Sequence, residues 1–193
     1  MVILYCDNVV GKSVNLCNIN RIKYKQGSGT ASIFISRVGD RSIIIKEKNS
    51  YKDDEYKIVS IVNDKLIEKS FPLIVRTYCI TQCSDKNLYM MEKVDMDTEI
   101  RYLLKMFNRD TQKEILRQCM AGIFFLNHIC GVYHNDLYYK NQIRNILLDY
   151  NSKDKNYPHY IIKILDFECS SKYPQFRTEL YHKKYFKEIK YVS

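Results

Sequence analysis

The chain has few residues that interrupt regular backbone structure, with six glycines and three prolines among 193 residues, and it has no tryptophan. It has no apolar run near the ~18 residues that a bilayer span requires, and its first seven residues lack the charged start and the length of a signal peptide. Hydrophobic residues make up 46% and charged residues 27%, enough to bury a core in one domain or two small lobes. We therefore expect a folded, intracellular protein with no membrane span.

The seven cysteines include no Cys-x-x-Cys pair, and the four histidines are scattered along the chain. A zinc site needs closely spaced pairs of ligands, and a reducing compartment disfavours a disulfide framework. We therefore expect reduced thiols, most of them in the core, and no metal–thiolate site.

The formal net charge of +9 has two interpretations. Excess Lys and Arg can attract anionic partners, or it can simply keep a surface solvated, and we favour the second. The best candidate for an acidic partner is the basic tail, residues 169–193, which interleaves tyrosines with Lys172, Arg177, Lys183, Lys184, Lys187 and Lys190. Its pattern predicts no specific nucleic-acid readout.

The first half of the chain alternates short apolar runs with turn residues, which is typical of hairpin strands. Residues 32–37, 43–46, 74–80 and 87–91 are the clearest of these runs. Residues 53–69 change to a helical period. The pattern predicts a five-stranded sheet with one helix.

The second half begins with a helix, because apolar residues recur at four-residue spacing across 115–124. Thr111 and Glu114 fit a capping box at its start, and Gly131 sits where it should end. Residues 145–148 and 160–165 then predict two buried strands, joined by a polar hairpin at 151–158. With a hinge near 92–94, we expect two lobes, residues 1–93 and 94–193.

The segment that follows this helix carries the strongest chemical signal. Phosphoryl transfer from Mg-ATP needs an Asp to accept a hydroxyl proton, an Asn five residues later and a second Asp at a strand end. Asp136, Asn141 and Asp166 meet this description, with Asp136 as the base and the other two as metal ligands. Asn145 is the alternative to Asn141, because the run Ile-Leu-Leu follows it; we favour Asn141. His134 is expected to brace the backbone through a hydrogen bond.

A glycine pair and a lysine in the first half fit the same chemistry. Gly27 and Gly29 begin a loop of the Gly-x-Gly-x-x-Gly kind, in which backbone N–H groups approach phosphates, although Ser32 stands in the third place. Lys46 follows a β-branched run and is placed to reach the α- and β-phosphates. A carboxylate on the next helix should orient it, and Glu55 is better placed than the fallback, Glu68.

The order of these motifs resembles the protein-kinase superfamily, and most closely the serine/threonine kinases of large DNA viruses. The resemblance spans residues 24–170 and rests on Gly27 and Gly29, Lys46, Met90-Met91-Glu92, Gln118, His134-Asn135-Asp136-Leu137, Asn141 and Asp166-Phe167. It implies that Met91, Glu92 and Lys93 form the hinge that binds adenine, with Met90 near the gatekeeper position.

The resemblance implies an α+β, two-lobed kinase-like fold, with an antiparallel sheet and one helix in the first lobe and a reduced, mainly helical second lobe. It implies ATP and Mg²⁺, or Mn²⁺, as cofactors and transfer of the γ-phosphate to Ser or Thr of a protein substrate. If the protein is viral, the host cytoplasm or the virion is its expected location.

Three departures from the family pattern keep other functions open. Asn135 replaces the Arg that pairs with an activation-loop phosphate, Glu168 replaces the Gly of Asp-Phe-Gly, and only 25 residues follow Glu168. A pseudokinase that binds nucleotide or a partner is therefore one alternative. The other is a small-molecule phosphotransferase, because His-Asn-Asp-Leu and Asp-Phe-Glu also resemble choline and ethanolamine kinases.

Overall fold

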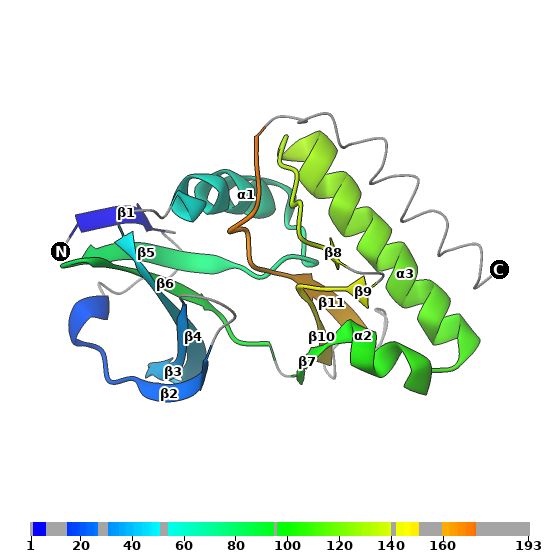
Figure 1. The fold of residues 1–193 in the computed structure, drawn as a ribbon, viewed down its shortest axis with the longest axis horizontal. Coiled ribbons are helices and arrows are strands. Elements are labelled where there is room, and N and C mark those ends of the chain that lie inside the picture. Colours follow the sequence, from blue (N-terminus) through cyan, green and yellow to red (C-terminus); the bar gives the residue numbers. More distant parts are fainter. Residues whose placement is uncertain are drawn as a thin grey trace. The chain divides into compact units, whose positions relative to one another are not determined.

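The computed structural model describes residues 2–6, 15–26, 31–50, 54–94, 96–139, 142–150 and 160–172. The chain is a mixed α+β protein with antiparallel sheets and few helices, which confirms the expected fold class at this level (Figure 1). It divides into two compact units, which we call unit 1 (residues up to 64, and 75–93) and unit 2 (residues 65–74, and 94 onward).

Unit 1 is built on an antiparallel sheet with the strand order β1-β5-β6-β4-β3-β2. The strands are β1 (Val2–Cys6), β2 (Ile22–Gln26), β3 (Ser32–Val38), β4 (Arg41–Asn49), β5 (Thr77–Cys83) and β6 (Lys86–Glu92). The expected five strands were one too few, because β1 adds an edge strand beside β5. The β-branched run 43–45 lies in β4, which pairs with β3 on one side and β6 on the other.

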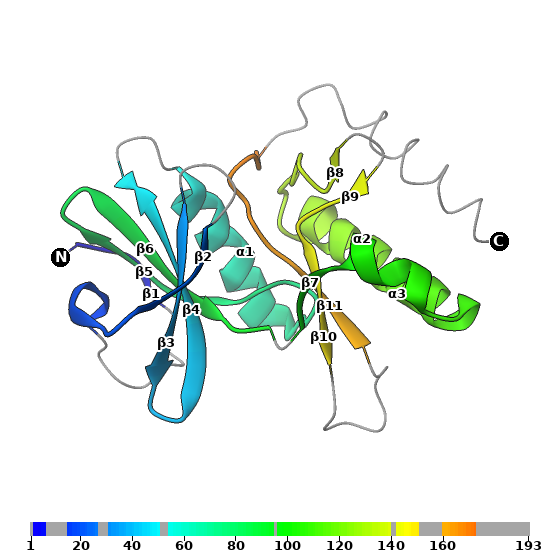
Figure 2. The ribbon, with the colours of Figure 1, turned by 60° about the horizontal axis from the view of Figure 1, so that its bottom comes forward.

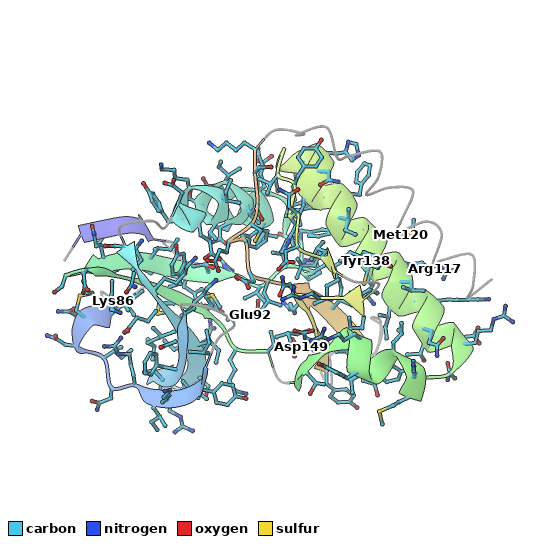
Figure 3. All side chains as sticks on the ribbon, in the orientation of Figure 1. Lys86, Glu92, Arg117, Met120, Tyr138 and Asp149 are labelled. Carbon is cyan, nitrogen blue, oxygen red and sulfur yellow. A yellow bond between two sulfur atoms is a disulfide. The ribbon has the colours of Figure 1, made fainter. Side chains whose placement is uncertain are left out.

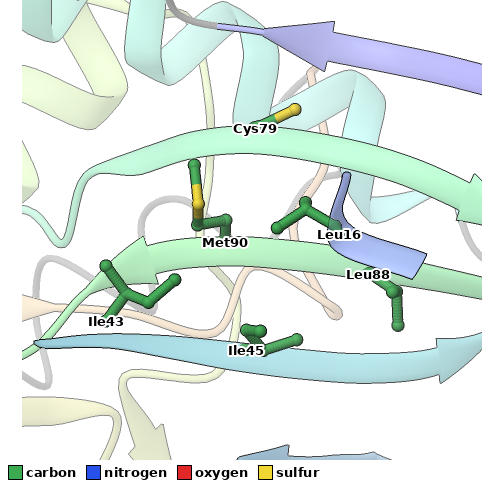
Figure 4. Packing of buried hydrophobic residues seen from close by; sticks show 6 residues of the cluster. All are labelled: Leu16, Ile43, Ile45, Cys79, Leu88 and Met90. Atoms are coloured by element: carbon green, nitrogen blue, oxygen red, sulfur yellow. The ribbon is translucent and has the colours of Figure 1, made fainter. Parts of the chain in front are cut away.

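The two faces of this sheet differ in chemistry because side chains alternate along a strand. One face carries an apolar cluster shown in Figure 4, to which the short 3₁₀ helix η2 (Leu16–Asn18) contributes the fully buried Leu16. The other members are Ile43, Ile45, Cys79, Leu88 and Met90. The opposite face carries Lys46 and Lys48, whose side chains meet the helix α1 (Glu55–Lys69).

Helix α1 begins within two residues of the start that its periodicity predicted. Its apolar positions, Ile58, Val59, Val62 and Leu66, are buried, as the helical spacing requires. Asn63 fixes it to β5, because its side-chain amide donates to the Thr77 carbonyl at 2.7 Å and its oxygen accepts from the Thr77 N–H at 3.2 Å.

A disulfide joins Cys17 in η2 to Cys83 at the end of β5. The expectation of reduced thiols was therefore wrong for this pair, whose Cα atoms lie 5.7 Å apart although 66 positions separate them in sequence. The bond holds η2 where Leu16 closes the apolar cluster. Cys79 and Cys119 are buried thiols outside this disulfide, and burial raises the pKa of Cys119 to about 12.

Unit 2 contains one long helix against a small antiparallel sheet of order β11-β10-β7 (Figure 2). Its elements are β7 (Met96–Glu99), α2 (Ile100–Leu103), η4 (Leu104–Met106), α3 (Arg109–Phe124), the π-helical turn η5 (Phe125–Ile129), β8 (Tyr138–Tyr139), β9 (Gln142–Ile143), β10 (Ile146–Tyr150) and β11 (Tyr160–Ile164). Strands β10 and β11 confirm the two that were expected after the Asp136 segment.

Helix α3 starts three residues earlier than the capping box predicted. Its N-cap is Asn108, whose side-chain oxygen accepts from the Thr111 N–H at 2.9 Å, so Thr111 lies in the first turn. The end of the helical segment agrees with prediction: Gly131 adopts φ +64°, a left-handed conformation that favours glycine. No helix among the described residues is long and apolar enough to cross a membrane.

The buried Gln118 fixes α3 to β11 by bonding the strand's backbone. Its amide nitrogen donates to the Tyr160 carbonyl, and its oxygen accepts from the Ile162 N–H, both at 3.0 Å. One turn later the helix approaches closely at Gly122, where an added Cβ would lie 2.6 Å from the Ile164 side chain. Together these contacts set the position of the chain that leaves α3.

Candidate functional site

The backbone after α3 is fixed by bonds to residues far along the chain. Tyr133 and Ser171 form an antiparallel bridge with two 2.9 Å backbone hydrogen bonds. The buried His134 donates from Nε2 to the Leu165 carbonyl at 2.8 Å. This is the backbone-bracing bond that the sequence predicted, and it ties the segment carrying Asp136 to the residue before Asp166.

The Asp136 carboxylate contacts the side chains of Asn145 and Arg144 in unit 2. The Asn145 amide donates to both its Oδ2, at 2.9 Å, and its backbone oxygen, at 3.0 Å. Arg144 Nη1 lies 3.5 Å from Asp136 Oδ1. The carboxylate is thus oriented by an amide, approached by a cation and left about a quarter exposed, at 24%.

A two-stranded hairpin, β8 with β9, explains how Asn145 reaches Asp136 across nine positions of sequence. Tyr138 pairs with Ile143 and Tyr139 with Gln142, and the Arg144 N–H donates to the Leu137 carbonyl at 3.0 Å. The pairing of these two strands brings the chain back beside the point where the hairpin began. Asn145, the alternative considered above, is the Asn that contacts Asp136, whereas Asn141 lies outside the described residues.

Asp166 follows β11 in a left-handed conformation, with φ +66°. The preceding residue, Leu165, is bonded at both backbone groups, because its carbonyl accepts from His134 and its N–H donates to the Asn145 carbonyl at 3.1 Å. The ring of the following Phe167 lies 5.0 Å from the His134 ring. The backbone of Asp166 is thus held on both sides by contacts to the Asp136 segment.

Asn135, which departs from the family pattern, has a structural role of its own. It adopts φ +62°, which Asn tolerates better than most residues. Its side-chain amide donates to the Cys169 carbonyl at 3.0 Å and to Ser171 Oγ at 3.1 Å. It therefore links the Asp136 segment to the chain beyond Phe167 without using charge. Glu168 is exposed in the turn between Phe167 and Cys169.

In unit 1, Lys46 forms the expected pair with Glu55. The ammonium lies 2.9 Å from both carboxylate oxygens, and both residues are only 6% exposed. Lys48, which sequence reasoning missed, shares the same carboxylate at 3.0 Å and is 5% exposed. The signal was available, because residues two apart on a strand share a face. Glu68 is exposed and pairs with Lys65 and Lys69 instead.

The predicted hinge residues lie at the end of β6. Met91 pairs with Ile44 and so shares the Lys46 face, whereas Met90 belongs to the apolar cluster on the opposite face. The position of Met90 near the gatekeeper remains a prediction. The Glu92 N–H donates to the Arg76 carbonyl at 2.8 Å, and its carboxylate accepts from the Arg76 N–H at 3.1 Å. Figure 3 marks Glu92 at the end of its strand.

Several predictions fall outside the described residues. They concern the glycines Gly27 and Gly29, Asn141, the polar hairpin at 151–158 and the basic tail beyond Lys172. Within the described part of the chain, no group of three or more His, Cys, Asp or Glu side chains gathers as a metal cluster. The oxygens of Asp166 and Asn145 are nonetheless the hard ligands that Mg²⁺ takes, usually together with waters and substrate phosphates. No protein-family model and no curated protein matches this chain.

Proposed function

We propose that this protein is a Mg²⁺-ATP-dependent phosphotransferase of the protein-kinase type, which transfers the γ-phosphate to Ser or Thr hydroxyls of a protein substrate. The observation that carries the proposal is the contact set around Asp136. Asn145 bonds its carboxylate, and His134 bonds the residue directly before Asp166. A proton acceptor, an amide and a second carboxylate on a braced backbone are the parts that phosphoryl transfer requires.

In this proposal each residue of unit 2 has one task. Asp136 accepts the proton of the acceptor hydroxyl, for which its partial exposure leaves room. Asp166 and Asn145 hold Mg²⁺, which when bound neutralises charge on the β- and γ-phosphates. Asn145 replaces Asn141 in this role, because its amide contacts Asp136 and its carbonyl oxygen can face a metal while its nitrogen donates.

Unit 1 supplies the groups for the rest of the nucleotide. Lys46 binds the α- and β-phosphates, and Glu55 orients its ammonium. The backbone of Met91 to Lys93 binds adenine, with the exception of the Glu92 N–H, which is already bonded to Arg76. The contacts of Lys46 favour this assignment over that of an ordinary surface lysine. Burying an ion pair costs desolvation energy, and a lysine with no task in the site would avoid that cost by facing water.

The decisive experiment follows labelled γ-phosphate from ATP in the presence of Mg²⁺. The acceptors are a generic basic protein, choline and ethanolamine, and the variants are Asp136→Asn and the exposed control Asp64→Asn on α1. We expect label on the protein, a loss on the order of 10²–10⁴-fold in Asp136→Asn and no change in Asp64→Asn.

Label on choline or ethanolamine would move the chain to the small-molecule phosphotransferases. No transfer to any acceptor, with ATP still raising the thermal unfolding temperature, would identify a pseudokinase. Unchanged turnover in Asp136→Asn would contradict the mechanism itself, whichever acceptor is labelled.

A further inference from the structure

Unit 2 has an apolar surface that the proposed site does not use. The ring of Phe107, directly after η4, lies 4.9 Å from the ring of Tyr160, which in turn lies 5.8 Å from the ring of Tyr150. Met106 precedes Phe107 and is 78% exposed, and Tyr150 is 48% exposed. We call Met106, Phe107, Tyr150 and Tyr160 the corner platform.

The corner platform is held in place by ordered backbone on both sides. Gln112, near the start of α3, donates from its side-chain nitrogen to the carbonyls of Leu104 and Phe107 at 3.0 and 2.9 Å. Tyr150 and Tyr160 form a cross-strand pair at the ends of β10 and β11. A surface whose side chains are already positioned loses little conformational entropy when it binds a ligand.

The surface around the corner platform is basic. Residues 99–117, which run from the end of β7 into α3, contain five Lys or Arg and three acids. Two of the acids are paired, Glu99 with Arg101 at 2.7 Å and Glu114 with Arg117 at 3.6 Å. The rest are three cations and one acid: Lys105, Arg109, Lys113 and Asp110. A ligand that approaches the platform therefore meets positive charge at its rim.

We propose that the corner platform is a docking site for an acidic protein segment that carries an aromatic or aliphatic anchor, an inference that does not depend on the proposed function. Aromatic residues and Met are enriched where proteins bind proteins, and a few buried anchors carry most of the binding energy. The anchor packs on Met106 and Phe107. Acidic residues beside the anchor meet Lys105 and Arg109, both of which are exposed, and this complementary charge selects the partner.

The ring geometry favours a protein over a single-stranded nucleic acid, the other anionic ligand that binds basic and aromatic surfaces. Successive bases stack on the faces of aromatic side chains. The planes of Phe107 and Tyr160 meet at 53°, and those of Tyr150 and Tyr160 meet at 61°, so these rings do not present a series of parallel faces. Met106, the most exposed residue of the platform, has no ring on which a base can stack.

The test measures the binding of fluorescently labelled peptides to the whole chain by anisotropy. The first peptide carries Phe and Leu among Asp and Glu residues, the second has Ala in place of the Phe and Leu, and the third has Lys in place of the acids. We expect only the first peptide to bind, with an affinity that falls as salt is added. Met106→Ser and Lys105→Glu should each weaken its binding on the order of tenfold.

Two matched variants control for the loss of an exposed methionine and for the change in net charge. Met120→Ser removes a second exposed methionine, which lies on α3 (Figure 3). Lys57→Glu reverses an exposed charge on α1. Both should bind the first peptide as the wild type does. Thermal unfolding of all four variants verifies that each is folded.

Several outcomes would overturn the proposal. Absence of binding by the first peptide would show that the platform does not accept an acidic segment, and equal binding by the Ala peptide would show that charge acts without an anchor. An oligouridylate that binds more tightly than the peptide and is weakened by the same variants would identify a nucleic-acid surface. Self-association of the wild type that Met106→Ser abolishes would identify a second copy of the chain as the occupant. No ATP enters this assay, so its result is independent of the labelled-phosphate experiment.

Discussion

Lys46 and Glu55 form a buried ion pair in which one ammonium lies 2.9 Å from both oxygens of the carboxylate. Lys48 adds a second ammonium to the same carboxylate. Glu55 is therefore the common partner of two buried cations. Removing Glu55 would affect both ammonium groups, whereas removing one lysine would leave the carboxylate paired with the other.

We expect Glu55→Gln to destabilise the protein more than Lys46→Met does. The first change deprives two buried ammonium groups of this carboxylate, whereas the second leaves Glu55 paired with Lys48. Breaking a buried pair costs about 3–5 kcal/mol, and we expect Glu55→Gln to reach that range and Lys46→Met to fall below it. Urea unfolding of both variants measures the difference. Equal losses, or a larger loss in Lys46→Met, would contradict the shared arrangement.

The two asparagines considered as metal ligands can be separated by matched glycine variants. Asn145 adopts φ +56°, so Asn145→Gly keeps its backbone free of strain and removes only the amide. We expect a loss of Mg²⁺-ATP affinity on the order of 10–100-fold or more, measured by calorimetric titration. Asn141→Gly should bind as wild type does. The opposite ranking would return the metal to Asn141, as the sequence spacing first favoured.

His134 can be tested through the carbonyl it bonds. His134→Phe preserves an aromatic ring beside Phe167 but leaves the Leu165 carbonyl without this donor. An unsatisfied buried carbonyl costs about 1–3 kcal/mol, and because this bond is only part-buried we expect the free energy of unfolding to fall by about 1 kcal/mol. Because Asp166 comes next, Mg²⁺-ATP binding should also weaken. A variant with wild-type stability would show that the bond is not needed to hold the Asp166 segment.

The disulfide provides a prediction that is independent of catalysis. Cys17 and Cys83 close a loop across 66 positions. A cross-link of that span lowers the entropy of the unfolded chain and so raises the free energy of unfolding by about 4 kcal/mol. The double variant Cys17→Ser, Cys83→Ser should lose stability of that order, and a reductant should do the same to the wild type. Cys169→Ser, at an exposed thiol outside the disulfide, is the control. If reductant leaves the unfolding curve unchanged, the bond does not form in solution.

The sequence predicted those elements of the fold that depend on neighbouring residues along the chain. The β-branched run of β4, the helical period of α1 and α3, and the stop at Gly131 all follow from side-chain spacing and backbone preference. The pairing of Lys46 with Glu55 and the bracing by His134 were also expected. They were expected from a resemblance to kinases, and the sequence spacing alone would not have predicted either contact.

The misses came from contacts that close over long stretches of chain. The contact between Asn145 and Asp136 was not predicted, because counting residues cannot show that strands β8 and β9 pair between them. The Cys17–Cys83 bond depends on how η2 returns to the end of β5. The helix start was misplaced because Asn108 and Thr111 both carry capping side chains, and only the backbone conformation decides between them.

The β8–β9 hairpin lengthens the chain between Asp136 and Asn145 without moving these two residues apart. Its two ends meet where the Arg144 N–H bonds the Leu137 carbonyl, so the chain leaves the hairpin almost where it entered. The residues of its tip can therefore vary in number or kind while Asp136 and Asn145 stay in contact. Under the proposed function, a change in the tip residues could therefore alter the choice of acceptor without any change to Asp136 or Asn145.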